Sequence, residues 1–529
     1  MSRSVVIILL FSYGFNAVIG KIQIGKILDA SMKLIGGTPS ATIAGSCDDC
    51  LCELLNSSTY FSFNCFMKNG TCAMFNRIDE NRSFTLTSET ESRVYFLSLF
   101  TETIAAVSEN DDLVLIWRFN RSLSDQSETY IGHSQSTSIF SSFGVTGDNA
   151  SLVLSRDSRE SVFVSHPFLE LFNRSWTFEA WIYLKNLSQK DYGIVGQCSK
   201  SEQNQCLHLN IRHKKLYFGF YSNDILDQQS LETEKWYHVA FTFDCTTRKR
   251  SLYLNGIEDN TNVSSNCYSG IDGNLTFGTI FLKQQYYSID GLIDEISFIN
   301  RSKSAQEILN DATLIVHLSF DQESISDCGP LKLPTVQTGN ISFTDGKIAG
   351  AVNIGYASES YILVKHLVLM STEIQAYSFS VWIKPISSGP ATIIHGSSNE
   401  LGGTPWCTSI LGLTHSSHLM AVSWARYLIT VTGPKIPNDS WTHATVIYTS
   451  SKILKVYING SFHNASQPFN DSFYAGAKYL FVGNSKKKHQ CAGVNQTGGQ
   501  YVGGIDDLRF YLRDLTDDEV KNLSAMGMN

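Results

Sequence analysis

Short segments of this chain alternate hydrophobic and polar positions. Between Trp236 and Phe243, one set of alternate residues is Tyr237, Val239, Phe241 and Phe243, and the other is Trp236, His238, Ala240 and Thr242. A period of two residues is typical of a β-strand with one face in a core. Such segments recur without long helical periodicity between them, so the pattern predicts a mainly β protein built from β-sandwiches.

Two Asn-Gly dipeptides mark predicted β-hairpins. They end the segments LYLNG (252–256) and VYING (456–460). Asn-Gly tolerates positive φ at both central positions of a type I′ turn, which joins two antiparallel strands tightly. Each half of the chain is therefore expected to contain one such hairpin.

The pattern as a whole is repeated along the chain. Three blocks recur in the same order: WTFEAWIYL (176–184) as YSFSVWIKP (377–385), EKWYHVAFTFD (234–244) as DSWTHATVIYT (439–449), and GLIDEISFI (291–299) as GGIDDLRFY (503–511). An ordered set of matches about 200 residues apart indicates a tandem pair of domains and not a short-period solenoid.

An acidic pair lies in the last block of each repeat, and a predicted helix start follows it. The pairs are Asp294-Glu295 and Asp506-Asp507, followed by Ser304-Ala-Gln-Glu307 and Thr516-Asp-Asp-Glu519. Ser or Thr with Glu three residues later fits the capping box, which satisfies the first free amides of a helix. Each repeat is expected to close with a strand and a short capped helix, so the acidic pairs are interpreted as architecture.

Length, charge and the N-terminus narrow the class of protein. A chain of 529 residues predicts three or four domains, and its net charge of −8 is spread without charged blocks, which argues against a nucleic-acid partner. Residues 1–20 place an apolar stretch after Arg3 and small residues near the end, as in a signal peptide. No later segment is long and apolar enough to span a bilayer, so we expect a secreted protein without a transmembrane segment in the mature chain.

Cysteines and sequons agree with export. Many Asn-x-Ser/Thr sequons predict an N-glycosylated protein, and clustered cysteines predict disulfides in an oxidising compartment. The twelve cysteines are Cys47, Cys50, Cys52, Cys65 and Cys72 in the N-terminal part, Cys198, Cys206, Cys245 and Cys267 in the first repeat, and Cys328, Cys407 and Cys491 in the second. Because two of these counts are odd, complete oxidation requires one bridge between modules, with Cys328 as its candidate in the second repeat.

The repeated motifs resemble the laminin-G-like, concanavalin A-like jelly-roll family of extracellular domains. The resemblance includes the entry strands LVLIWRFNRSLSD (113–125) and LIVHLSFDQESISDCG (314–329). It implies two tandem antiparallel jelly rolls, at 109–310 and 311–529, on a scaffold that commonly binds glycans or proteins outside cells. Such a fold hosts many functions, so the resemblance does not specify one ligand.

The segment 21–108 is similar to the PAN/apple modules. Its cysteine-rich stretch CDDCLCELLNSSTYFSFNCFMKNGTCAMFN (47–76) is followed by the apolar RVYFLSLF (93–100). The resemblance implies a small disulfide-rich α+β module, with bridges drawn from Cys50, Cys52, Cys65 and Cys72 in a pairing that stays open. A plain cysteine-rich spacer is the alternative.

Glycosidases also occur on jelly rolls of this kind. Retaining hydrolysis requires two carboxyl groups about 5–5.5 Å apart, and laminarinase-type enzymes place them on one face of a strand. Leu292 and Gly504 precede Asp294 and Asp506 by two residues, and Glu295 alternates to the opposite face. We therefore expect no catalytic residue and no enzymatic activity.

Several residues are candidates for binding. Calcium is a possible cofactor, with Asp294 and Asp506 as weak candidate ligands and no metal site assigned. His238 and His443 recur beside matching tryptophans, which indicates a framework role. The candidate ligand-binding residues are Tyr286 and Tyr287, for stacking on sugars, and Lys486, Lys487 and Lys488, for acidic glycans.

The sequence thus predicts a secreted glycoprotein that binds extracellular carbohydrate or protein ligands without catalysis, in adhesion or recognition. Weak contacts from linked modules add through effective concentration, which suits such a role. The alternatives are a carbohydrate-active enzyme or its accessory, and a structural component of the extracellular matrix. The sequence leaves the ligand and the oligomeric state open.

Overall fold

The computed structural model describes residues 112–529 with short gaps, and seven strands before residue 112. The gaps are 135–138, 148–150, 156–159, 166–167, 199, 283, 358, 372–375, 404–405, 425–427, 470–476, 485–490, 492–496 and 527–529. The chain divides into two compact units, Met1–Asp111 and Asp112–Asn529.

The first unit contains a five-stranded antiparallel sheet in the order β1-β7-β4-β5-β3 and a ribbon of β2 and β6. The strands are β1 (Gln23–Leu28), β2 (Met32–Ile35), β3 (Ala41–Ala44), β4 (Tyr60–Phe66), β5 (Thr71–Asn76), β6 (Thr85–Ser88) and β7 (Ser92–Ser98). The register of β4 and β5 places Cys65 opposite Cys72. The PAN/apple module stays a prediction, because its helix, its disulfides, Cys47, Cys50 and Cys52, and the predicted signal peptide lie outside the described residues.

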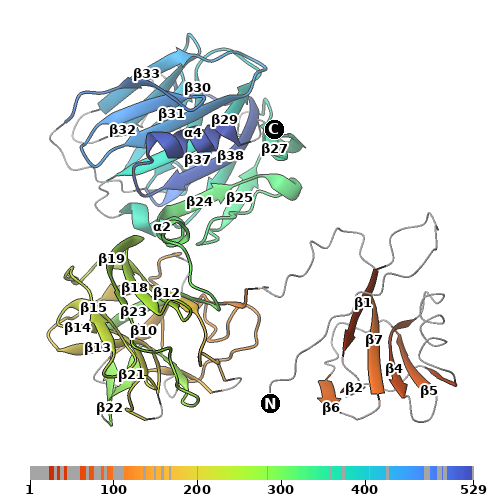
Figure 1. Ribbon diagram of the computed structural model, residues 1–529. Coiled ribbons are helices and arrows are strands. Elements are labelled where there is room, and N and C mark those ends of the chain that lie inside the picture. Colours follow the sequence, from red (N-terminus) through yellow and green to blue (C-terminus); the bar gives the residue numbers. More distant parts are fainter. Residues whose placement is uncertain are drawn as a thin grey trace. The chain divides into compact units, whose positions relative to one another are not determined.

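The first jelly roll consists of two sheets (Figure 1). One has the order β19-β18-β17-β12-β23-β10-β9, with β8 also paired to β23: β8 (Val114–Trp117), β9 (Phe140–Ser141), β10 (Ser151–Leu154), β12 (Trp176–Leu184), β17 (Trp236–Asp244), β18 (Lys249–Leu254), β19 (Ile257–Val263) and β23 (Gly291–Ile299). The other has the order β11-β20-β13-β14-β15-β16, with the hairpin β21–β22 attached to it: β11 (Val162–Val164), β13 (Asp191–Gln197), β14 (Leu207–Arg212), β15 (Lys215–Gly219), β16 (Asp224–Leu226), β20 (Leu275–Phe277), β21 (Thr279–Leu282) and β22 (Gln285–Ser288).

The second jelly roll repeats this arrangement. Its helix-covered sheet has the order β26-β27-β38-β29-β34-β35-β36, with β24 paired to β38: β24 (Leu314–Leu318), β26 (Ile341–Asp345), β27 (Gly350–Ile354), β29 (Tyr377–Pro385), β34 (Thr442–Tyr448), β35 (Leu454–Ile458), β36 (Ser461–Ala465) and β38 (Gly503–Tyr511). The opposing sheet has the order β25-β28-β37-β30-β31-β32-β33: β25 (Thr335–Thr338), β28 (Tyr361–Val364), β30 (Ala391–Ser397), β31 (Cys407–Leu413), β32 (His418–Trp424), β33 (Leu428–Lys435) and β37 (Tyr479–Val482). The predicted duplication of a β-sandwich is confirmed.

The predicted hairpins and strand faces are also present. Asn255 and Gly256 join β18 to β19 with φ of 51° and 83°, and Asn459 and Gly460 join β35 to β36 with φ of 47° and 79°. Positive φ at both positions is the conformation that a type I′ turn requires. In β17 the Tyr237 face lies in the core between the sheets, and the opposite face is buried as well.

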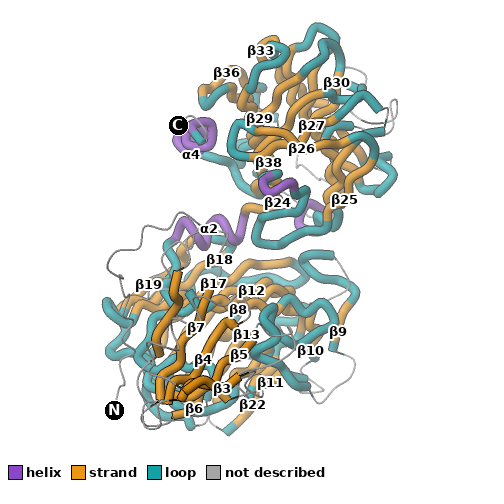
Figure 2. Tube along the Cα trace, turned by 90° about the vertical axis from the view of Figure 1, so that its right-hand side faces the viewer, coloured by secondary structure: helices purple, strands orange, loops and turns teal. Residues whose placement is uncertain are grey.

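A short helix accounts for this second buried face. In the first jelly roll α2 (Ala305–Thr313) packs Ile308 against Ala240 and Tyr253 of the sheet, and in the second α4 (Asp517–Ala525) lies over the matching sheet (Figure 2). Both predicted capping boxes are confirmed, from Ser304 and Thr516. Among the described residues, no helix has the length and apolar character needed to cross a membrane.

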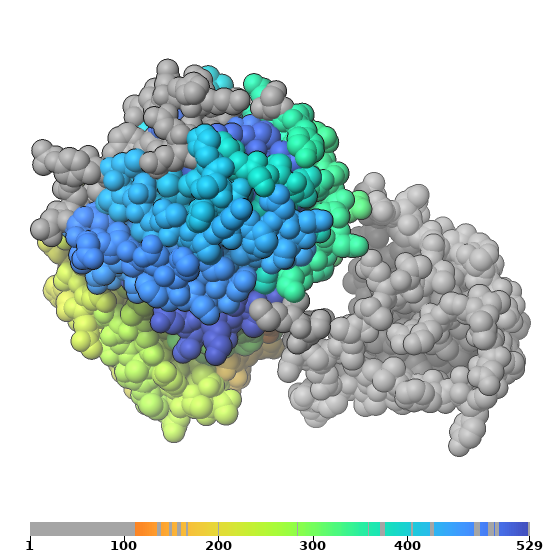
Figure 3. All heavy atoms as spheres, turned by 90° about the horizontal axis from the view of Figure 1, so that it is seen from above, coloured from red at the N-terminus to blue at the C-terminus, as the bar shows by residue number. Residues whose placement is uncertain are grey.

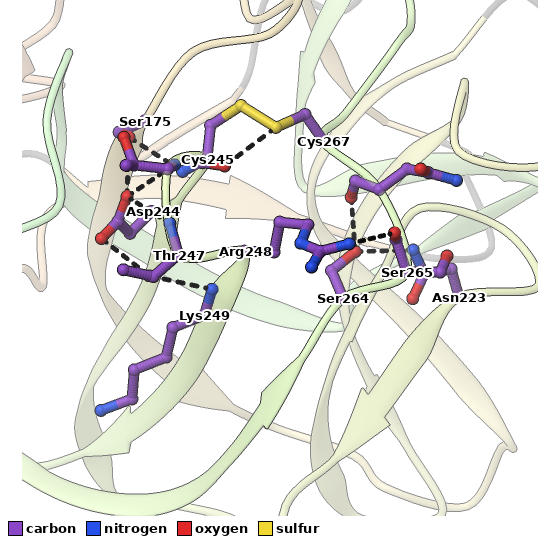
Figure 4. Close-up of a disulfide and its surroundings, with 12 residues drawn as sticks. Ser175, Asn223, Asp244, Cys245, Thr247, Arg248, Lys249, Ser264, Ser265 and Cys267 are labelled. Atoms are coloured by element: carbon purple, nitrogen blue, oxygen red, sulfur yellow. Dashed lines mark hydrogen bonds between the residues drawn. A yellow bond between two sulfur atoms is a disulfide. The ribbon is translucent and has the colours of Figure 1, made fainter.

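Three disulfides lie within the jelly rolls, and each joins cysteines of one repeat: Cys198–Cys206, Cys245–Cys267 and Cys407–Cys491. Beside the second of these, the Asp244 carboxylate accepts hydrogen bonds from Thr247 and Ser175, which closes the turn after β17 (Figure 4). Cys328 is exposed and unpaired. The predicted bridge from Cys328 to the N-terminal module stays a prediction, because the side chains of that module lie outside the described part of the chain.

Candidate functional site

The two acidic pairs occupy matching irregularities in their sheets. The register of β23 against β12 shifts between Glu179 and Trp181, and that of β38 against β29 shifts between Ser380 and Trp382. The second acidic residue of each pair has positive φ, 49° at Glu295 and 44° at Asp507. A β-bulge re-aims the side chains next to it, so the two carboxylates of a pair have separate surroundings.

The first carboxylate of each pair holds a loop. Asp294 Oδ2 accepts a hydrogen bond from the Val145 amide at 2.9 Å, and Asp506 Oδ2 accepts from the amides of Lys347 and Ile348 at 2.7 and 2.8 Å. Both aspartates are buried. Burial raises the pKa of Asp506 to about 7 and that of Asp294 well above its usual range, although the amide donors act in the opposite direction.

The second carboxylate of each pair is held by basic side chains. Glu295 Oε2 pairs with Arg118 Nη1 at 2.5 Å, and Asp507 Oδ1 accepts from His317 Nε2 at 2.8 Å and from Arg509 Nε at 3.0 Å. All four carboxylates therefore have a partner from the protein itself. This arrangement agrees with the architectural interpretation of the pairs.

Calcium gains no support from Asp294 and Asp506. In both residues Oδ2 faces N–H donors, whose positive ends would repel a cation. The described parts of the chain also contain no group of three or more His, Cys, Asp or Glu side chains that could hold a metal ion. Calcium binding elsewhere stays a prediction.

The repeated histidines pack against the repeated tryptophans, as a framework role requires. The rings of His238 and Trp181 lie 5.3 Å apart and those of His443 and Trp382 5.0 Å apart. Burial lowers the pKa of His238 to about 3 and that of His443 to about 4. Both imidazoles are therefore neutral parts of the core at physiological pH.

The polar neighbours of these histidines differ between the repeats. His238 Nε2 lies 3.4 Å from Glu179 Oε2, and Glu179 is also paired with Lys303, whereas His443 Nε2 lies 2.8 Å from Ser380 Oγ. Burial raises the pKa of Glu179 to about 7. This cluster lies beneath α2, so it belongs to the scaffold.

Tyr286 and Tyr287 lie on the hairpin β21–β22, which crosses the outer face of the second sheet of the first jelly roll. A Cβ on Gly193 of β13 would come within 2.6 Å of the hairpin backbone, so only glycine admits this close crossing. Tyr286 is 57% exposed, and its ring packs on Phe281 at 5.0 Å. Tyr287 is half-buried, and its hydroxyl donates to Gln285 Oε1 at 3.0 Å.

A polar cluster lies on the same sheet face, which we call the sheet-face cluster: Asp191, Asn210, Arg212 and Tyr217. Arg212 Nε donates to Asp191 Oδ1 at 2.5 Å, and the guanidinium lies 4.0 Å over the Tyr217 ring. Asn210 donates to the same Asp191 oxygen at 3.2 Å, while its own Oδ1 is buried without a hydrogen-bond partner in the described structure.

The second jelly roll does not repeat the sheet-face cluster. In the first, Asn210 stands opposite Tyr217 in the sheet, whereas at the matching positions of the second Gly412 stands opposite Met420. Sequence reasoning missed this cluster because it searched for residues that the repeats share. A search for polar positions present in only one copy would have found it.

A second feature missed from the sequence is a hollow at the rim of the second jelly roll. It lies between the 3₁₀ turn η1 (Asp321–Glu323) and the β26–β27 hairpin and measures about 530 Å³. The green segment that forms it follows one side of this jelly roll in the space-filling view (Figure 3). We call it the rim hollow; its lining is Phe320, Gln322, Glu323, Phe343, Thr344, Asp345, Ala349 and Gly350.

The remaining predicted contacts, Lys486, Lys487 and Lys488, lie outside the described residues. The loop that follows them is tied to β31 by the Cys407–Cys491 disulfide. Among the described residues, the structure does not bring Tyr286 and Tyr287 together with the acidic pairs.

Three of the solved structures similar to this chain are domains of larger enzymes or of a toxin. Domain 4 of a GH43 extracellular arabinanase from Geobacillus stearothermophilus, in complex with arabinotriose, is 25% identical with a TM-score of 0.28, over 40% of this chain and 98% of that one. The receptor-binding domain of botulinum neurotoxin type G is 14% identical with a TM-score of 0.31, over 40% and 51%. A CBM40 domain of the Ruminococcus gnavus IT-sialidase, bound to α2,3-sialyllactose, is 12% identical with a TM-score of 0.27, over 32% and 96%.

No sequence among the curated proteins matches this chain. A family model described as the concanavalin A-like lectin/glucanases superfamily matches it twice, at residues 157–309 and 357–521. One match falls within each sandwich, and together they cover more than half of the chain. The chain therefore belongs to the concanavalin A-like lectin/glucanase superfamily, with two copies of the domain in tandem.

Proposed function

We propose that this protein is a secreted, N-glycosylated recognition protein that binds extracellular glycans through its first jelly roll without cleaving them. The superfamily includes both lectins and glucanases by its description, so membership alone does not separate binding from catalysis. Whether this chain binds glycans or cleaves them has to be judged from its own residues.

The state of the carboxylates favours binding over hydrolysis. A retaining or inverting glycosidase needs one carboxylic acid and one carboxylate facing the scissile bond. Asp294 and Asp506 instead fasten loops through backbone amides, and Glu295 and Asp507 are ion-paired. Their repetition in both jelly rolls also points to a shared structural task.

The observation that carries the proposal is the pairing of an exposed aromatic ring with a polar face found in one repeat alone. Tyr286 presents its ring to solvent while Phe281 limits its movement, as a platform for a sugar ring requires. The nearby sheet-face cluster supplies the guanidinium of Arg212 on the same face, and the fully buried Asn210 holds Asp191, the partner of Arg212, in place. Sugar hydroxyls accept hydrogen bonds, so the N–H groups of a guanidinium suit them.

A glycan array with the purified glycoprotein, followed by titration of the best ligand, tests this proposal. Tyr286→Ala should weaken binding roughly tenfold, which corresponds to about 1.4 kcal/mol. The matched control is Phe462→Ala on β36, because Phe462 is also 57% exposed and also packs on one aromatic ring, that of Tyr457. Equal loss in both variants would contradict the proposal.

Two further measurements separate the alternatives. Incubation of the bound glycan with the protein should release no new reducing ends; turnover that disappears in Asp294→Asn or Asp506→Asn would establish a glycosidase instead. Expression with the native N-terminus should place the protein in the culture medium with glycans on its sequons. Absence of any glycan ligand would favour a structural matrix component.

A further inference from the structure

The rim hollow of the second jelly roll combines aromatic surface with several hydrogen-bond acceptors. Phe320 is buried in the core, and Phe343 is half-buried, so the apolar side-chain surface of the lining comes from Phe343 and Ala349. Gln322, Glu323 and Asp345 are exposed and form the polar part. A volume of about 530 Å³ lies within the range of roughly 300–1,000 Å³ typical of small-molecule sites.

The acceptor groups of the rim hollow are free to meet a ligand. Within the described ranges, neither the Glu323 nor the Asp345 carboxylate has an ion-pair or hydrogen-bond partner. This distinguishes them from Asp294, Glu295 and Asp507, which are all committed to protein donors. Two exposed carboxylates at one opening give it a negative potential.

The backbone around the rim hollow is held in place before any ligand arrives. Asp321 Oδ1 accepts from the Gly350 amide at 2.9 Å, and Asp506 holds the amides of Lys347 and Ile348. Glu323 has a φ of 53°, a conformation that non-glycine residues adopt rarely. Hydrogen bonds therefore hold both chain segments that border the hollow.

No cation neutralises the rim hollow from the neighbouring loop. Lys347 follows Asp345 closely in the chain, but its Nζ lies over the Trp382 ring, 5.5 Å from the ring centre. This cation–π contact directs the ammonium to the tryptophan. The negative potential of the hollow therefore repels sulfated and sialylated sugars and attracts positively charged groups.

We propose that the rim hollow is a second binding site, for an amine-bearing sugar, a hexosamine unit with a free ammonium group. The ammonium supplies donors to Glu323 and Asp345, the ring hydroxyls bond to Gln322 and Thr344, and the apolar face of the ring packs on Phe343. The side chain of a lysine from another protein is the alternative ligand, and it would need an apolar channel with a single anionic group at its end. The rim hollow instead has several acceptors spread around an aromatic surface, which fits the many hydroxyl groups of a sugar better.

This site is separate from the one proposed for the first jelly roll. The two lie on different repeats and have different charge, so each proposal stands or falls alone. In the first repeat the loop that matches 345–350 carries Val145, which is buried in a hydrophobic cluster with residues of the second.

Calorimetric titration of the full glycoprotein tests the proposal with three probes: a glucosamine trimer, its N-acetylated counterpart and trilysine. The glucosamine trimer should bind, with affinity that falls as salt rises. Glu323→Gln and Asp345→Asn should each weaken it at least fivefold. Thermal melting of each variant shows whether the fold is intact.

The matched control is Glu128→Gln in the first jelly roll. Glu128 is an exposed carboxylate with a φ of 56°, close to that of Glu323, so its replacement changes charge and backbone context in the same way. Equal binding of the acetylated trimer, tighter binding of trilysine, no binding of any probe, or an equal effect of Glu128→Gln would each overturn the proposal.

Discussion

At the scale of single residues, the same side chain can hold a fold together or remain free for a ligand, and its hydrogen-bond partners decide which. Asp506 and Asp345 are both aspartates of the second jelly roll. The first is buried and accepts two backbone amides, and the second lines an open hollow without a partner among the described residues. Sequence shows both as acidic residues near glycines and cannot separate them.

Replacing Asp506 should destabilise the second jelly roll. Asp506→Ala leaves the amides of Lys347 and Ile348 without their acceptor, and each buried polar group left unpaired costs about 1–3 kcal/mol. We expect the free energy of unfolding, measured by urea denaturation, to fall by about 2 kcal/mol or more. Asp518→Ala, at an exposed helix position, is the control; similar stability of both variants would contradict the anchoring role.

His443 should contribute to the pH dependence of stability. Its pKa is about 4 in the folded protein because of burial, against an ordinary value of 6.5. Between pH 6.5 and 4 the unfolded chain binds a proton that the folded protein excludes, so the free energy of unfolding falls as the pH falls, by up to about 3 kcal/mol from this group.

The variant His443→Gln isolates this effect from other titrating groups. The stability difference between the parent and this variant should be larger at pH 7 than at pH 4.5, as measured by urea denaturation. His463→Gln, at an exposed position of β36, is the control for replacing a histidine by glutamine. A constant difference for His443→Gln would show that its imidazole is not buried in neutral form.

At the scale of elements, both repeats use one device to end a strand and begin a helix. The capping boxes of α2 and α4 are reinforced by an arginine three residues before the cap: Arg301 reaches Glu307 at 2.6 and 3.2 Å, and Arg513 reaches Glu519 at 2.6 and 2.8 Å. The sequence predicted the boxes from residue spacing. It missed the arginines, because a bidentate contact depends on how the preceding turn folds back.

The contribution of the α4 cap to stability can be measured with variants of Thr516 alone. Thr516→Ala removes the oxygen that accepts the Glu519 amide at 3.2 Å, and loss of an N-cap costs about 0.5–2 kcal/mol. Thr516→Ser keeps the hydroxyl and should retain most of the stability. Urea denaturation of both variants tests this, and equal destabilisation would mean that the threonine methyl group, and not the hydrogen bond, matters.

At the scale of the whole molecule, the two jelly rolls share a scaffold but differ in what they present. The first carries Tyr286 and the sheet-face cluster, and the second carries the rim hollow with Glu323. Duplication kept the buried positions that both copies need for packing. The exposed faces differ, so the two proposed sites are expected to take two kinds of ligand, and binding at linked sites adds through effective concentration.

The pairing of cysteines is a prediction for the whole chain. Non-reducing peptide mapping should find Cys198–Cys206, Cys245–Cys267 and Cys407–Cys491, and a bridge from Cys328 to one of the five N-terminal cysteines. Cys328 is exposed, so a free thiol there would be alkylated readily without reduction. Such alkylation would show that the jelly rolls and the N-terminal module are not joined covalently.

The sequence by itself determined the features that depend on neighbours along the chain. Strand alternation, the Asn255-Gly256 turn, both helix caps and the duplication follow from local conformational preferences and from a pattern written twice. Only the tertiary structure decided whether each polar side chain is buried and which hydrogen-bond partners it has. Whether Asp506 meets amides, Tyr286 meets solvent or Glu323 borders a hollow depends on segments distant in sequence, because burial and hydrogen bonding arise only when those segments pack together.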